Sequence, residues 1–222
     1  MAEADDGLTP TALSRALDLA PSTIHRMLDR LGALGMVRLD RDRRHYVAVL
    51  EFYRLSALIV ARTEFTHIAR NALAALAEEA GETCFFAFYM PDERRIMYDA
   101  RATGSPSIHI ATQLHEPLAL SCGAAGLAML TALDPLETDA VLSDDDGPAV
   151  PRAMLFETLA EIRRSGYAAS HDARIAGAVE IAAAVSGVAG GMVGALSIAI
   201  PESGFDPEFE SEIARLVIDH AD

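Results

Sequence analysis

The chain has 222 residues and a formal net charge of −15, and 51% of its residues are hydrophobic. This length is enough for two small domains, each with its own core. A membrane-spanning protein is excluded, because the longest apolar stretch, residues 181–200, is interrupted by serine and glycine and indicates a buried hairpin. The N-terminus carries no secretory signal, so we expect a cytoplasmic protein without a membrane partner. Two cysteines, Cys84 and Cys122, are too few for a disulfide framework, and we expect reduced thiols.

The charge is distributed unevenly along the chain. Residues 1–62 contain nine arginines and eight acidic residues, whereas the remainder contains nine arginines and 25 acidic residues. Within the first part, positive charge gathers in residues 38–45. An acidic body would repel DNA while a locally basic head orients binding, which fits a regulator better than a general DNA coat.

The first 49 residues predict a winged helix-turn-helix. Thr9-Pro10 is typical of a helix start, and residues 18–20 form a three-residue turn into a second helix that ends at Gly35. Two short strands, residues 36–39 and 45–49, flank a charged turn and predict a hairpin that serves as the wing. Two apolar faces are expected in the head: Leu13, Ala16 and Leu17 on the first helix, and Ile24, Met27, Leu28, Leu31 and Leu34 on the second.

The polar face of the second helix is the candidate DNA reader. Hydroxyls, an imidazole and guanidinium groups can follow phosphates and reach base edges, with contact by Thr23 and Arg26 as the main expectation. The alternative is an ordinary solvated helix face. The expected DNA-binding residues on the helix are Ser22, Thr23, His25, Arg26 and Arg30, and those on the wing are Arg41, Arg43 and Arg44.

The remainder of the chain predicts an α+β domain. Helices are expected at residues 50–62, 64–80, 121–133, 151–165 and 208–220; strands are expected at 83–89, 95–101, 107–112, 181–188 and 192–200. Residues 144–148 are expected to form a solvated loop. The predicted organisation is a DNA-binding domain at 1–49, a linker helix at 50–62 and a second domain at 63–222.

Six segments in order resemble the IclR family of bacterial transcription regulators. They are GLTPTALSRALDLAPSTIHRMLDRLGALGMVR in the head, then LAEEAGET, LALSCGAAGLAML, RRSGYAAS, Gly177 with IAAAV, and GALSIAIP. The resemblance covers almost the whole chain. It implies a winged helix-turn-helix, a linker helix and a GAF/PAS-like effector domain with an antiparallel sheet. It further implies homodimers or homotetramers that bind double-stranded promoter DNA and respond to a small-molecule effector.

The chain departs from this family at the head. Members have a further helix before the GLT segment, whereas this sequence begins at that segment, so either its start codon was assigned too late or the head is incomplete. In the turn, the family prefers glycine, leucine, proline and a basic residue, whereas this chain has Asp18-Leu19-Ala20-Pro21. The absence of one phosphate-binding lysine predicts lower operator affinity.

The resemblance places the effector between the sheet and the start of the small-residue helix. Glycine and alanine leave room there, and backbone N–H groups at a helix start favour an anion. Glu180 stands where the family often has cysteine, and three environments remain open: contact with a donor or cation on the ligand, pairing with Arg174, or solvent. Together with Ser170 and Ala199, it indicates a ligand other than a small keto acid. The expected effector-binding residues are Ser121, Cys122, Gly123, Ala124, Ser170, Ala178, Glu180, Ser197 and Ala199.

The sequence gives less support for a catalytic cysteine, a metal site or a dinucleotide-binding loop. Cys122 with His109, His115 or His171 as base would make a nucleophile, but a small buried thiol is the simpler interpretation. The same histidines lack the close spacing of a metal site, and residues 187–194 lack the spacing of a dinucleotide loop. We therefore expect no enzyme activity, cofactor or metal. The predicted function is a ligand-responsive regulator of a catabolic promoter that senses an organic acid or aromatic catabolite; the alternative is a ligand-binding module whose truncated head no longer binds DNA.

Overall fold

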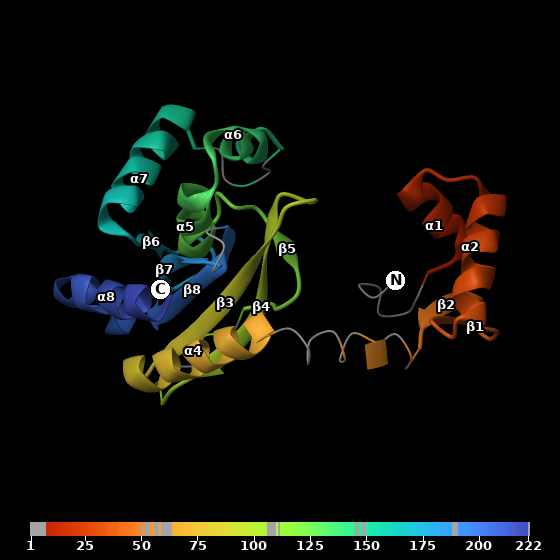
Figure 1. Cartoon of the computed structure of the whole chain (residues 1–222), viewed down its shortest axis with the longest axis horizontal. Coiled ribbons are helices and arrows are strands. Elements are labelled where there is room, and N and C mark those ends of the chain that lie inside the picture. Colours follow the sequence, from red (N-terminus) through yellow and green to blue (C-terminus); the bar gives the residue numbers. More distant parts are fainter. Residues whose placement is uncertain are drawn as a thin grey trace. The chain divides into compact units, whose positions relative to one another are not determined.

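The computed structural model describes residues 8–49, 51, 54–55, 58, 64–105, 110, 112–144, 147, 150–187 and 191–221. The chain divides into two compact units, Met1–His67 and Ile68–Asp222 (Figure 1). Most of the linker helix expected at residues 50–62 lies outside the described residues.

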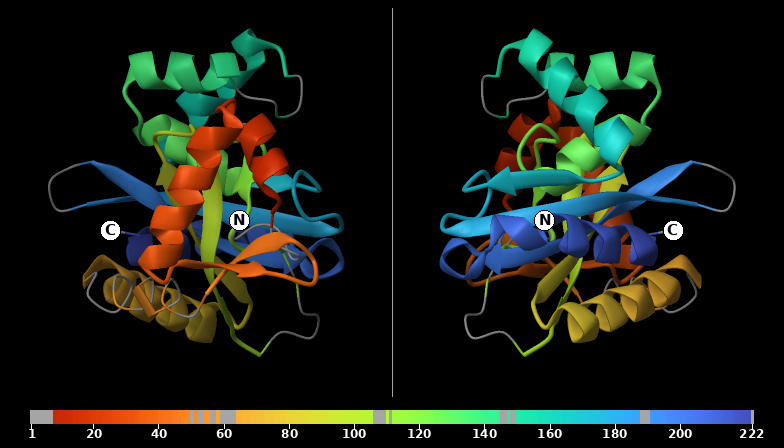
Figure 2. Two further views of the ribbon diagram at one scale, coloured as in Figure 1. Left: turned by 90° about the vertical axis from the view of Figure 1, so that its right-hand side faces the viewer. Right: turned by 90° about the vertical axis from the view of Figure 1, so that its left-hand side faces the viewer.

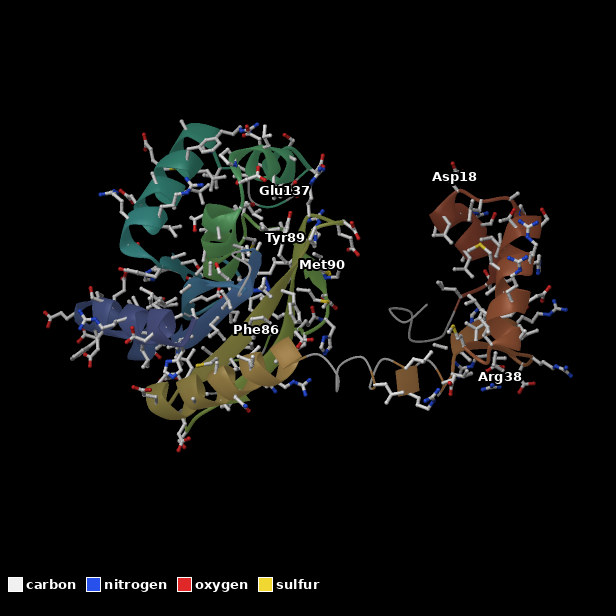
Figure 3. The ribbon with its side chains drawn as sticks, in the orientation of Figure 1. Asp18, Arg38, Phe86, Tyr89, Met90 and Glu137 are labelled. Carbon is white, nitrogen blue, oxygen red and sulfur yellow. The ribbon has the colours of Figure 1, made fainter. Side chains whose placement is uncertain are left out.

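The first unit contains two helices and a hairpin. Helix α1 (Pro10–Leu17) begins as expected, because the Thr9 side chain accepts a hydrogen bond from the Ala12 N–H at 3.1 Å. After a short turn, whose Asp18 is labelled in Figure 3, helix α2 (Pro21–Ala33) follows. Strands β1 (Val37–Asp40) and β2 (His45–Ala48) pair antiparallel and form the predicted hairpin.

The hairpin is extended by the residue before the cap of α1. The Leu8 N–H donates to the Tyr46 carbonyl at 3.1 Å, and the Tyr46 N–H donates to the Leu8 carbonyl at 2.9 Å. These two hydrogen bonds fix the start of the described chain to β2. The helical pair and the wing are therefore joined by backbone hydrogen bonds as well as by side-chain packing.

The core of this unit is smaller than the apolar pattern predicts. Ile24, Leu28 and Val37 are buried, but Met27 is 44% exposed and Leu34 is 63% exposed. At 100° per residue, Met27 and Leu34 fall at the edge of the stripe centred on Ile24 and Leu28, beyond the reach of α1 and β1. The predicted five-residue buried stripe is wrong at these two positions. The face expected on α1 is likewise incomplete, since Ala16 and Leu17 are exposed.

The second unit is built on one antiparallel sheet in the order β5-β4-β3-β8-β7-β6. Its strands are β3 (Thr83–Met90), β4 (Arg95–Thr103), β5 (Pro117–Leu118), β6 (Ala168–His171), β7 (Ala178–Ser186) and β8 (Met192–Pro201). Figure 2 shows β7 and β8 as long neighbouring strands. The predicted hairpin and the first two predicted strands are confirmed. Ile110 and Thr112, the described residues of the strand expected at 107–112, lie outside any strand, and β5 comes later instead.

Helices cover both faces of this sheet. Helices α4 (Glu64–Ala80) and α8 (Glu210–Ala221) lie on one face, and α5 (Ala124–Ala132) lies on the other with α7 (Arg152–Ser165) packed outside it (Figure 1). Two short 3-10 turns, Glu202–Gly204 and Pro207–Phe209, precede α8. Helix α6 (Pro135–Asp144) and strand β6 are additions to the predicted elements, and the residue Asp144 ends α6 rather than beginning a loop.

Backbone segments approach very closely around α5 and the central strands. A Cβ added to Gly126 would lie 2.1 Å from the Leu120 carbonyl oxygen, and one added to Gly194 would lie 2.1 Å from the Ala87 carbonyl oxygen. Because no side chain fits at either position, α5 and β8 can pack directly against their neighbours. Gly126 therefore lets α5 lie against the segment that precedes it, and Gly194 lets β8 lie against β3.

Candidate functional site

One face of α2 presents the predicted DNA-binding residues to solvent. Ser22, Arg26 and Arg30 are exposed and follow one another at four-residue spacing, while Thr23 beside them is half-buried. At 100° per residue, Arg26 lies roughly 160° from Ile24, so this strip is on the opposite side of α2 from the core. His25 is exposed at the edge of the strip.

The wing places three arginines at its tip. Arg41, Arg43 and Arg44 are exposed in the turn between β1 and β2, and Arg38 extends from β1 (Figure 3). Asp40 shapes the turn, since its Oδ1 accepts hydrogen bonds from the backbone N–H groups of Arg43 at 3.2 Å and Asp42 at 3.0 Å. These bonds lower the pKa of Asp40, so the carboxylate that orders the turn stays ionised.

The predicted effector-binding residues of the sheet share one face. Ser170 on β6, Glu180 on β7 and Ala199 on β8 are direct cross-strand neighbours. Ser197 and Ala178 lie two residues from Ala199 and Glu180 on the same strands, and side chains two apart point to the same side. This is the face that α5 covers.

The start of α5 is joined to this face by hydrogen bonds. The Ala124 N–H donates to both Glu180 Oε2 and Ser170 Oγ, each at 3.0 Å. Gly123 makes this approach possible, because its φ is 90° and an added Cβ would lie 3.0 Å from Glu180 Oε2 and 3.2 Å from Arg174 Cδ. The structure therefore brings Gly123, Ala124, Ser170 and Glu180 together.

Glu180 is buried, with 4% of its surface exposed, so the solvent-facing alternative is wrong. Its Oε1 accepts a hydrogen bond from the Tyr98 hydroxyl at 2.6 Å. Burial raises the pKa of Tyr98 well above its ordinary value, and the negative charge of Glu180 raises it further. The hydroxyl therefore stays protonated and donates a hydrogen bond to the carboxylate.

Arg174 lies over the ring of the same tyrosine. Its Cζ is 4.1 Å from the Tyr98 ring centroid, which is a cation–π arrangement. Its Nε and Nη1 are buried without a hydrogen-bond partner among the described residues, and the second alternative for Glu180, pairing with Arg174, is not formed. Ser197 is fully buried, and its hydroxyl opposes part of the rise in the Tyr98 pKa. Among the described residues, this hydroxyl makes no hydrogen bond of ordinary geometry.

Two of the participating residues, Tyr98 and the stacked Arg174, were not among the predicted effector-binding set. Ile96 and Tyr98 lie two residues apart on β4 and share its buried face, so the period of two in this strand could have placed the Tyr98 side chain in the core. Arg174 precedes β7 in a loop without periodicity, and no sequence signal indicates that it stacks on β4. Tyr98 and Glu180 are 82 residues apart in the sequence.

The alternative chemistry has little geometric basis. Cys122 Sγ lies 3.4 Å from the Ala173 carbonyl oxygen, and His171 Nδ1 is 3.2 Å from Glu202 Oε1. Burial, followed by the charge of Glu82, raises the pKa of the Cys84 thiol to about 12. No cluster of three metal-ligating side chains occurs among the described residues, and His109 lies outside them. Within the same residues, no helix is long and apolar enough to cross a bilayer.

The opposite face of the sheet contains a cavity. It has a volume of about 200 Å³ and lies between β8, α8 and the end of α4, next to Glu82. Ile198, Ile200 and Phe209 are among its lining residues, and none of the predicted effector-binding residues contributes to it. The cavity and the cluster of Tyr98, Arg174 and Glu180 therefore lie on opposite faces of the sheet.

Two family models and a curated relative match this chain. The family model described as "Bacterial transcriptional regulator IclR C-terminal" matches residues 57–222, and the one described as "IclR helix-turn-helix domain" matches residues 1–41. The HTH-type transcriptional regulator BhcR of Paracoccus denitrificans is 28% identical over 221 residues, covering 97% of this chain and 78% of the relative.

Solved structures show the same fold. An IclR transcriptional regulator from Silicibacter sp. TM1040 superimposes with a TM-score of 0.84 at 24% identity, covering 96% of this chain and 86% of the other. An IclR homologue from Microbacterium hydrocarbonoxydans, complexed with 4-hydroxybenzoate, gives a TM-score of 0.72 at 20% identity, with coverages of 96% and 89%. The matched domains, in the same order along almost the whole chain, identify it as a member of the IclR family of bacterial transcriptional regulators.

Proposed function

We propose that the chain binds promoter DNA through α2 and the β1–β2 wing and that a small metabolite controls this binding. The observation that carries the proposal is the exposed strip of Ser22, Arg26 and Arg30, which lies on the opposite side of α2 from the buried core. Guanidinium groups can pair with guanine edges or phosphates, and the wing arginines add contacts to the backbone. The proposed target is a catabolic promoter.

The effector is proposed to bind under the start of α5, beside Gly123, Glu180 and Ser197. Support comes from the buried ionisable groups on that face and from the relative whose structure contains 4-hydroxybenzoate. An organic acid or aromatic catabolite is the proposed class. The chain acts as a homodimer or homotetramer that presents paired DNA-binding heads. The effector favours arrangements of the oligomer with a different separation of these heads and is not chemically changed.

Substitution of Arg26 tests the DNA-binding half of the proposal. A double-stranded fragment selected by the wild-type protein from random DNA serves as the probe in a gel-shift titration. Arg26→Ala is expected to lose about 1–3 kcal/mol of binding free energy, roughly 5- to 150-fold in Kd, because one guanidinium contact is removed. Arg215→Ala, an exposed arginine on α8, is the matched control and should bind as wild type. Equal affinity of the two variants would remove Arg26 from the interface.

Native mass spectrometry of the purified full chain tests the remaining half. It measures the number of subunits and any retained small molecule in one experiment. A dimer or tetramer is expected, and addition of the retained molecule should change the affinity for the selected DNA. A strictly monomeric protein that selects no DNA sequence would contradict the proposed function and favour a ligand-binding module alone.

A further inference from the structure

The start of α5 already holds an anion supplied by the chain itself. Glu180 Oε2 accepts from the Ala124 N–H at 3.0 Å, and this N–H is the group that a bound anion would use at a helix start. A Cβ added to Gly123 would lie 3.0 Å from Glu180 Oε2, so any other residue there would press on this carboxylate. The place at which a ligand carboxylate would be expected is therefore occupied by the Glu180 carboxylate.

Glu180 nevertheless has unused hydrogen-bonding capacity. Each of its oxygens accepts one described hydrogen bond, from Tyr98 on Oε1 and from Ala124 on Oε2. A carboxylate has about four acceptor positions, so about two remain. Because the residue is only 4% exposed, water does not freely satisfy them, and a donor group on a ligand would.

Arg174 is complementary to Glu180, because it has buried donors where Glu180 has acceptor positions. Its buried Nε and Nη1 are donors without partners among the described residues, and its guanidinium is stacked on Tyr98, the residue that also bonds Glu180. Ser197 adds a fully buried hydroxyl near Tyr98 on the same sheet face, and among the described residues this hydroxyl makes no hydrogen bond of ordinary geometry. These groups are independent of the helix start, and each is costly to bury unless something bonds to it.

The charges decide what kind of molecule fits. Glu180 and Arg174 together are neutral, so a ligand that is neutral overall preserves the balance, whereas a plain carboxylate leaves a net negative charge in a buried site. We infer that the effector is a zwitterionic amino acid-like compound, whose ammonium group binds Glu180 and whose carboxylate binds Arg174. This inference rests on the proposed function, since it names the ligand class of the same site.

The test compares acids that differ only in an amino group. Isothermal calorimetry of the wild-type full chain is performed with three pairs: propionate and β-alanine, butyrate and γ-aminobutyrate, and p-methylbenzoate and p-(aminomethyl)benzoate. In at least one pair the amino compound is expected to bind tenfold or more tightly than its partner. Plain acids that bind as tightly as their amino counterparts would overturn the inference, and so would a failure of all six compounds to bind.

Glu180→Gln identifies the group responsible. The amide keeps the shape and an acceptor for Tyr98 but removes the charge, so the preference for the amino compound should fall at least tenfold. Glu137→Gln is the matched control, because Glu137 also accepts a tyrosine hydroxyl, that of Tyr89 at 2.7 Å, on the part of β3 that faces α6. An unchanged preference in Glu180→Gln would overturn the inference. The wild-type comparison decides alone if that variant does not fold.

Failure of this inference can be told apart from failure of the proposed function. If plain acids but not amino acids release the protein from the selected DNA, the inferred ligand class is wrong and the proposed role as a ligand-responsive regulator still holds. If the chain binds an amino compound tightly but selects no DNA, the inferred ligand class is supported and the proposed DNA-binding function is wrong.

Discussion

At the scale of single residues, Gly123 controls whether α5 can approach β7. Its φ of 90° is rarely adopted by residues with a side chain, and an added Cβ would press on Glu180 and Arg174. We expect Gly123→Ala to lower the free energy of unfolding by about 1–3 kcal/mol, as measured by urea denaturation. Gly204→Ala is the control, since a Cβ there meets nothing within 4 Å. Equal stability of the two variants would show that the backbone at Gly123 relaxes without cost.

Tyr98 is the second residue for which the hydrogen-bond geometry gives a definite expectation. Tyr98→Phe keeps the ring under Arg174 but leaves Glu180 Oε1 buried without its donor. The expected loss is about 1–3 kcal/mol in the free energy of unfolding. Tyr89→Phe removes a comparable bond to Glu137 from a half-buried site that water can reach, and its loss should be smaller. A larger loss in Tyr89→Phe than in Tyr98→Phe would contradict this ranking.

At the scale of elements, α1 depends on its cap because it buries little. It has eight residues, none of them fully buried, and Thr9 satisfies one of its free N–H groups. Thr9→Ala is expected to weaken the helix by about 1 kcal/mol, which should appear as faster amide hydrogen exchange within α1. Thr11→Ala, an exposed change two residues later, should leave exchange unchanged or slower. Unaltered exchange in Thr9→Ala would mean that packing on α2 alone holds α1.

The elements that could be predicted are those with local signals. Thr9-Pro10 and the short apolar runs of β3 and β8, each bounded by glycine or proline, were sufficient to place α1 and these two strands. Helix α6 was missed, although Asp134-Pro135 carries the same type of start signal and Asp134 Oδ1 accepts from the Leu136 and Glu137 N–H groups. Its buried residues, Thr138 and Val141, are too few to give an apolar period.

The candidate site shows a different limit of sequence reasoning. Gly123 and Glu180 could be found because small residues before a helix and a carboxylate in an apolar strand are unusual in themselves. The stacking of Arg174 on Tyr98 depends on a loop meeting a strand across the sheet, which no local pattern encodes. The four-residue strand β6 is similar, because it is defined by pairing with β7 rather than by its own composition.

At the scale of the whole molecule, the sign of charge separates the two parts of the chain. Residues 63–222 hold 25 of the 33 acidic residues, while the wing tip is rich in arginine. Replacing Arg41, Arg43 and Arg44 together with alanine should weaken DNA binding and reduce the slope of log K against log salt by roughly 0.9 for each phosphate that the protein no longer neutralises. Filter binding between low and moderate salt measures this slope. A slope equal to that of wild type would exclude the wing from binding phosphate.

Helix α5 has a consequence for how variants of this protein fail. It has no charged residue, six of its nine residues are buried, and it lies between the sheet and α7. Most helices are amphipathic and keep a polar face in contact with water when a domain partly unfolds, but α5 has no charged face of this kind. Variants in which this unit partly unfolds will therefore expose the apolar surface of α5 and aggregate before they refold. Soluble yield, rather than a reversible melting curve, will be the most sensitive measure of damage beneath α5.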